Sequence, residues 1–241
     1  TLGEHHLGHP ILSTPIQTLK NIAQRAILNI KFATGTCCVG TEPLSYTSSV
    51  KPGQSLTADD LDRSHIAKLA AESEFPGENI FITATVANLP SHLVPNGGKR
   101  VLNKAQTQEI VDIFHSLGKK IGAHIEGSEN VQMFIDCGGD VVHHGHGATA
   151  HHFKEMEKKD IALVATPHGG TSSTPNTPEQ IYEAIKFGVN TAIATDSYLP
   201  VHPDAIGMGE MEIVGPSNFL QICKPTFEYL TQQGISKIDC L

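Results

Sequence analysis

Hydrophobic positions along the chain recur with two alternating periods, which predicts helices and strands in turn. Over residues 15–28 apolar side chains recur at helical spacing, and the short apolar run at 31–37 is typical of a buried parallel strand. A second pair follows, with a helix expected at 57–72 and a strand at 79–86. Each predicted helix therefore leads into a predicted strand.

The same alternation continues to the end of the chain. Asn103 with Gln106 and Thr177 with Gln180 form capping-box patterns, and Pro178 stands at the first helical position of the second helix. Pro225 is expected to kink or break the last helix. The further elements expected are helices at 103–117, 130–137, 150–159, 177–188 and 218–233, and strands at 120–125, 140–144, 161–166 and 191–196.

Strands separated by helices indicate right-handed βαβ units and a parallel sheet. The sheet could be a closed barrel or an open doubly wound sheet, and the latter would favour a glycine-rich phosphate loop after its first strand. Neither GxGxxG nor GxxxxGK[ST] is present. We therefore predict an α/β fold, a parallel (β/α) TIM-like barrel of about seven strands, incomplete relative to eight units, without a β-sandwich domain and forming one domain over residues 1–241.

Composition narrows the functional classes. The formal charge is −8 and no block of basic residues occurs, which argues against a nucleic-acid surface. No apolar stretch is long enough to span a membrane, the N-terminus lacks the pattern of a signal peptide, and the five cysteines form an odd, scattered set. These features predict a soluble, cytoplasmic protein that acts on a small molecule, and they leave open whether it forms a homo-oligomer.

Histidine is abundant, with 14 residues among 241, and several follow strands. His124 and His144 lie at the ends of two predicted strands, His168 follows the next, and Asp196 ends the one after it. The carboxyl ends of barrel strands carry the functional groups, so these side chains are expected to share one mouth. His151 and His152 instead fall early in a predicted helix and are expected to be solvated.

The N-terminal segment GEHHLGH supplies further candidate ligands. Glu4 and His6 alternate along a possible first strand, so their side chains could converge on one ion. Imidazoles with a carboxylate suit zinc or a similar divalent cation. A carboxylate such as Asp196 could then accept a proton from activated water and pass it to a leaving group. Glu126 and His168 are expected to face the substrate.

Two segments, AHIEGSENVQMFIDCGGDVVHHGHG and IALVATPHGGTSSTPNTPEQIYEAIKFGVNTAIATDS, resemble the amidohydrolase superfamily of metal-dependent hydrolases. The resemblance covers roughly residues 104–200. It implies that His124 binds metal, that His144 binds a second metal or polarises the substrate carbonyl, and that Asp196 binds metal and shuttles the proton. The implied reaction is cleavage of an amide, cyclic amide or amidine C–N bond other than a peptide bond.

The chain departs from that family pattern in ways that favour a single ion. The first strand of the family ends in HxH, whereas Glu4 stands here where the first histidine belongs. Many members with two ions use a carbamylated lysine on strand four, and the segment NIFITATV has no lysine. We therefore expect one divalent ion, zinc in the first place, held by His6, His124 and Asp196 with Glu4.

Two alternatives remain at this stage. A metal-dependent phosphoesterase on a histidine-rich barrel would need basic residues around its site, and few lie near these strand ends. A degenerate barrel that binds a partner without catalysis would be consistent with Glu4 and with the shortened barrel.

Overall fold

The computed structural model describes the C-terminal part of the chain most fully, over residues 98–167, 175–194 and 219–236. It also describes residues 80–85 and three short N-terminal strands. Of the predicted helix at 15–28 only Asn21, Gln24 and Arg25 are described, and these are helical. The predicted helix at 57–72 lies outside the described residues.

The strands form two parallel sheets in which sequence neighbours are spatial neighbours. The first sheet pairs β1 with β2, and the second has six strands in the order β3-β4-β5-β6-β7-β8. Their bounds are β1 His5–Leu7, β2 Ile30–Phe32, β3 Thr36–Cys37, β4 Ile80–Thr83, β5 Ile121–Glu126, β6 Val141–His146, β7 Ala162–Ala165 and β8 Thr191–Ile193. A consecutive parallel order is the one that βαβ units produce.

The observed sheet agrees with the predicted α/β class, but the described strands do not close into a barrel. No pairing joins the two sheets among the described residues. β2 and β3 both overlap the segment at 31–37 that was expected to be one strand, and they pair with different neighbours. The predicted closed form and the count of about seven strands are therefore not confirmed.

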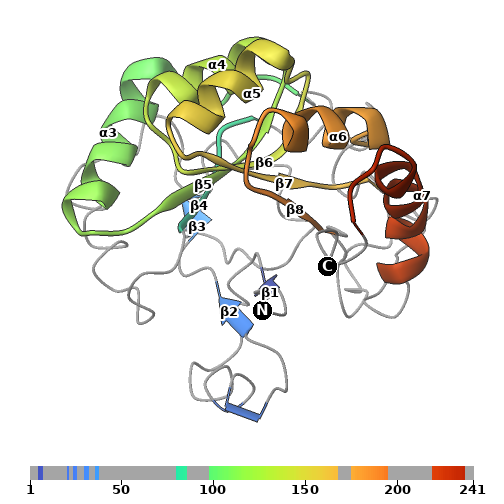
Figure 1. Ribbon diagram of the computed structural model, residues 1–241. Helices are drawn as coiled ribbons and strands as arrows, with labels where there is room; N and C mark the ends of the chain where they lie inside the picture. The colour runs from blue at the N-terminus through green and yellow to red at the C-terminus, as the bar shows by residue number, and fades with distance from the viewer. Residues whose placement is uncertain are drawn as a thin grey trace, which may run out of the picture.

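Helices cover one face of the larger sheet. They are α3 Lys104–Ser116, α4 Ser128–Asp136, α5 Ala150–Lys158, α6 Pro178–Lys186 and α7 Phe219–Gln232. Figure 1 shows α3, α4, α5 and α6 on the same side of the strands, and α7 beside α6 at the end of the row. The core between sheet and helices contains buried aromatic side chains from three helices, namely Phe114, Phe134 and Phe153.

The side-chain bonds predicted at the starts of α3 and α6 are present, but of these two helices only α3 has the complete capping box. The Asn103 side chain accepts from the Gln106 backbone, and the Gln106 side chain accepts from the Asn103 backbone, which closes the capping box of α3. At α6 the Thr177 hydroxyl accepts from the Gln180 backbone at 3.2 Å, with Pro178 in the first turn. Both helix starts are thus confirmed.

Of the kink or break expected at Pro225, the break is wrong, because α7 runs through that residue. Proline removes one backbone hydrogen bond, but three side chains on one face of the helix, Cys223, Thr226 and Leu230, are buried. Packing of that face, together with the Tyr182–Tyr229 ring contact to α6, holds the helix across the proline. None of the described helices combines the length and apolarity needed to cross a lipid bilayer.

Candidate functional site

Two buried polar side chains occupy the carboxyl end of β5. His124 and Glu126 stand two positions apart on the strand, so both point to the same side of the sheet. Both are buried, and His124 Nε2 lies 3.7 Å from Glu126 Oε1. The backbone N–H of Glu126 donates to the Thr85 hydroxyl at 3.1 Å, which fixes the end of β5 against the segment that follows β4.

A bulge at the end of β6 brings His144 to the same side as His124. His144 pairs with Ile125 and His146 pairs with Glu126, so Gly145 is an extra residue in the ladder. His144 and Gly145 have left-handed backbone conformations, with φ of 65° and 61°. Instead of sharing the side of Ile125, the His144 ring meets that of His124 edge to face, with centroids 4.6 Å apart.

The ring of His144 is held by the end of the next strand. Its Nδ1 lies 2.9 Å from the hydroxyl of Thr166, a buried residue directly after β7. Because this hydrogen bond engages Nδ1, a contact of the ring with substrate or metal would be made through Nε2.

His146 is a further buried imidazole of this cluster. Its ring lies nearly parallel to that of His144, at 16° with centroids 5.9 Å apart, and burial lowers the pKa of His146 to about 4. Within the described part of the chain its Nε2 is buried without a hydrogen-bond partner. The sequence reasoning missed His146 because the strand was expected to end at residue 144. The run HHGHG was the signal that could have found it.

Gly147 lets the ends of β5 and β6 approach each other. Its φ is 85°, and a Cβ there would lie 2.9 Å from the backbone nitrogen of Ser128. Beside it the Gly127 N–H donates to the His146 carbonyl at 2.7 Å. This close approach of two backbone segments places the end of β6 against the start of α4.

The structure brings together three of the side chains predicted for the site, namely His124, Glu126 and His144. His6 lies in β1, of which only the backbone is described. The remaining candidates, Glu4, His168 and Asp196, lie outside the described residues.

The donors present suit a divalent cation in their chemistry. Imidazole nitrogens and a carboxylate are typical zinc ligands, and the buried Nε2 of His146 is a polar atom that a ligand would satisfy. Restricted to the described residues, no group of three or more His, Cys, Asp or Glu side chains is arranged to hold a metal ion. A full ligand set would therefore need residues beyond this cluster.

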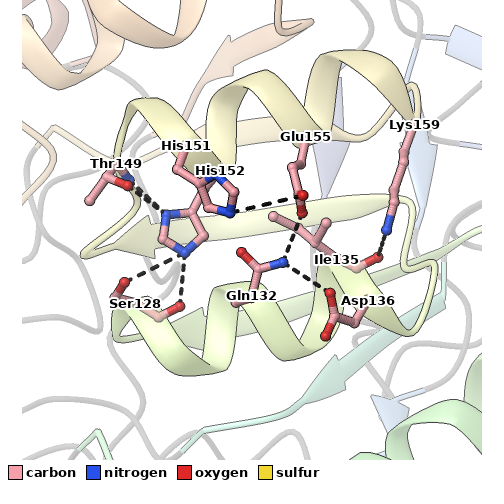
Figure 2. A network of polar contacts seen from close by, with 9 residues as sticks. All are labelled: Ser128, Gln132, Ile135, Asp136, Thr149, His151, His152, Glu155 and Lys159. Carbon is pink, nitrogen blue, oxygen red and sulfur yellow. Dashed lines mark hydrogen bonds and ion pairs between the residues drawn. The ribbon is translucent and has the colours of Figure 1, made fainter.

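A second polar network lies between α4 and α5, and it corrects the expectation that His152 is solvated. Figure 2 shows the His152 ring between Thr149 and Ser128. The Thr149 N–H donates to Nδ1 at 3.0 Å, and Nε2 lies 3.1 Å from the Ser128 carbonyl oxygen. His152 is buried, whereas its neighbour His151 is exposed as expected. The network is a contact between helices rather than a part of the histidine cluster.

The chain is similar in structure to solved hydrolases. Molinate hydrolase matches with a TM-score of 0.63 and 13% identity over 98% of this chain and 60% of that one. Phenylurea hydrolase B matches with 0.62 and 14% over 98% and 61%, and a Xaa-Pro dipeptidase with bound methionine with 0.62 and 16% over 96% and 59%.

These neighbours are amidohydrolase-superfamily enzymes. At such identities the likeness shows the fold alone, and it agrees with the predicted α/β class with a parallel sheet. This chain spans about three fifths of the length of each of these neighbours. No protein-family model and no curated protein sequence matches the chain.

Proposed function

We propose that this chain is a metal-dependent hydrolase of the amidohydrolase type that cleaves an amide, cyclic amide or amidine C–N bond in a small molecule. The observation that carries the proposal is the buried contact of His124, Glu126 and His144 at the carboxyl ends of β5 and β6. In folds of this kind, that end of the sheet carries the chemistry. The hydrolases among the structural neighbours support the reaction class.

In this proposal His124 holds one divalent ion, zinc in the first place, together with His6, Asp196 and Glu4. When bound, such an ion supplies Lewis-acid activation of water near neutral pH. Asp196 accepts the proton that the attacking water gives up and delivers it to the leaving nitrogen.

His144 acts on the acyl side of the scissile bond. Its ring is fixed through Nδ1 by Thr166. In the tautomer that carries its proton on Nε2, the Nε2–H can donate to a carbonyl oxygen as negative charge develops there. Glu126 and His168 contact the substrate. The Glu126 carboxylate lies beside His124, which suits it to accept a hydrogen bond from a polar N–H of the substrate.

Metal analysis of the purified protein tests the proposal most directly. The wild-type chain is expected to bind about one zinc ion, and His124→Ala is expected to lose it. His151→Ala changes an exposed imidazole on α5 and serves as the matched control, with metal content unchanged. A His124→Ala variant with wild-type metal content would contradict the proposal.

A substrate panel tests the reaction. N-acyl amino acids, lactams and aminopurines cover the proposed bonds. Dipeptides ending in proline are added because one structural neighbour is named a Xaa-Pro dipeptidase. Hydrolysis that requires the metal and is abolished in His124→Ala is the expected result. Metal binding without hydrolysis of any class would indicate a binding protein instead.

A further inference from the structure

Asn176 is a buried amide that joins three elements around His144. It lies in the loop before α6, and its side chain reaches the ends of both β6 and β7. Neither the resemblance to known hydrolases nor the strand-end pattern gives this residue a role.

Both ends of the Asn176 amide have close partners. Oδ1 accepts from the Thr166 backbone N–H at 2.7 Å, and Nδ2 donates to the His144 carbonyl oxygen and to Gln180 Oε1, each at 2.8 Å. A buried amide with all these contacts fixes the positions of the groups around it.

Asn176 binds His144 and Thr166, the two residues that contact each other at the ends of β6 and β7. Thr166 holds the His144 ring by its hydroxyl, at 2.9 Å from Nδ1, and Asn176 holds the Thr166 backbone. On the other side Asn176 holds the His144 backbone itself. One side chain thus sets both the position of the ring and the position of the group that orients it.

The backbone at His144 needs such support. A left-handed conformation is unfavourable at a residue with a Cβ, and His144 has φ 65°. Gln180 adds to the brace, since its Nε2 lies 3.4 Å from the carbonyl oxygens of Gly145 and Ala148. The loop before α6 and the first turn of α6 therefore hold the bulge, through Asn176 and Gln180 respectively.

We infer that Asn176 is a positioning residue for His144: through its bonds to the His144 carbonyl and to Thr166 it holds the imidazole with Nδ1 on Thr166 and Nε2 directed to ligand. The consequence for catalysis rests on the proposed function, whereas the consequence for the ring is a property of the protein alone. The inference can therefore be tested without a substrate.

The ring is observed by long-range proton–nitrogen NMR of the histidine side chains, with His144 assigned from the signals that His144→Gln removes. The nitrogen shifts of wild-type His144 are expected to be those of one fixed arrangement of the ring nitrogens. In Asn176→Ala and Thr166→Val they are expected to move toward the average of the two tautomers. Thr166→Ser, which keeps the hydroxyl, is expected to restore them.

Asn103→Ala is the control, because it removes the cap of α3 and lowers stability without touching the cluster. Asn176→Asp keeps the acceptor for Thr166 N–H and the shape of the side chain, so it reports even where alanine prevents folding. If folded Asn176→Ala or Asn176→Asp keeps the wild-type His144 shifts, the inference is wrong.

Kinetics separate this inference from the proposed function. Once a substrate is known, Asn176→Ala is expected to lower kcat roughly ten- to a hundredfold with little change in KM. Displaced His144 shifts in a protein that hydrolyses nothing would uphold the positioning role and refute the hydrolase. If the wild-type protein is an active enzyme and the variant keeps the wild-type shifts and kcat, the hydrolase proposal is upheld and the positioning role is refuted.

Discussion

The imidazole rings of His124 and His144 meet edge to face, at 67° with centroids 4.6 Å apart, because the backbone of His144 is left-handed. A regular strand would have turned His144 to the side of its ladder partner Ile125. The contact at the centre of the proposed site therefore depends on the bulge of β6. Substitutions of the imidazole rings should therefore change activity, whereas substitutions that disturb the backbone beside the bulge should change stability.

Replacing His144 by glutamine is expected to lower kcat by roughly 10²–10³, the usual effect of losing one donor to a developing oxyanion. Metal content should stay near the wild-type value, because in the proposal His124 and its partners hold the ion. The check is kcat together with elemental analysis of the same preparation. His151→Gln, on the exposed face of α5, should match wild type in both measurements. Loss of metal in His144→Gln would make His144 a ligand rather than a polarising group.

Gly147→Ala is expected to destabilise the protein more than Gly118→Ala does. Both glycines have positive φ, of 85° and 68°, so each alanine should cost about 1–2 kcal/mol from the backbone alone. A Cβ at Gly147 would also lie 2.9 Å from the Ser128 nitrogen, whereas at Gly118 no atom lies within 4 Å. That overlap should add about 1–3 kcal/mol to the loss. Urea unfolding of the two variants measures the difference. Equal losses in the free energy of unfolding would contradict the close approach of Gly147 to Ser128.

His146→Leu is expected to raise the free energy of unfolding of the metal-free protein, by about 1 kcal/mol. Burial of its Nε2 without a hydrogen-bond partner among the described residues is unfavourable, and an apolar side chain removes that penalty. His151→Leu on the exposed surface should stay within about 0.5 kcal/mol of wild type. Urea unfolding after chelation compares the three proteins. A destabilised His146→Leu would mean that the imidazole has a stabilising partner.

Sequence patterns predicted the elements well where a side chain marks the boundary. The Asn103 and Thr177 caps placed the starts of α3 and α6 correctly, because their side chains accept from the first turn of each helix. The start of α4 was predicted at residue 130 and lies at Ser128. Gly127, which precedes that helix with φ 86°, has no side chain to cap it and left no signal in the sequence.

The candidate site was predictable in part for the same physical reason. The positions of His124 and His144 at strand ends follow from the alternation of strands and helices. The side to which His144 points does not, because it depends on the left-handed backbone of His144 and Gly145 at the bulge. The roles of Asn176 and Thr166 also escaped prediction, since a loop amide and a hydroxyl gain meaning only when β6, β7 and α6 are brought together.

Stability is expected to fall in acid in part through His152. Burial lowers the pKa of His152 below its usual value of 6.5, although its hydrogen bond with Ser128 opposes that effect. The geometry also favours the neutral ring, because the Thr149 N–H donates to Nδ1 and a proton on that nitrogen would oppose it. Below about pH 6.5 the unfolded chain therefore binds a proton that the folded chain resists, so stability decreases as pH falls.

The contribution of His152 is isolated by comparison with His152→Gln. At pH 7.5 wild type should be the more stable of the two, by about 1–3 kcal/mol for the lost hydrogen bonds between α4 and α5. This advantage should shrink as pH is lowered to 5, because only the wild-type protein has an imidazole to protonate at this place. The histidines that lie far from residue 152 are present in both proteins, so their contributions cancel in the difference. Urea unfolding at a series of pH values measures the free energies, and an advantage that stays constant from pH 7.5 to 5 would show that His152 has equal proton affinity in the folded and unfolded chain.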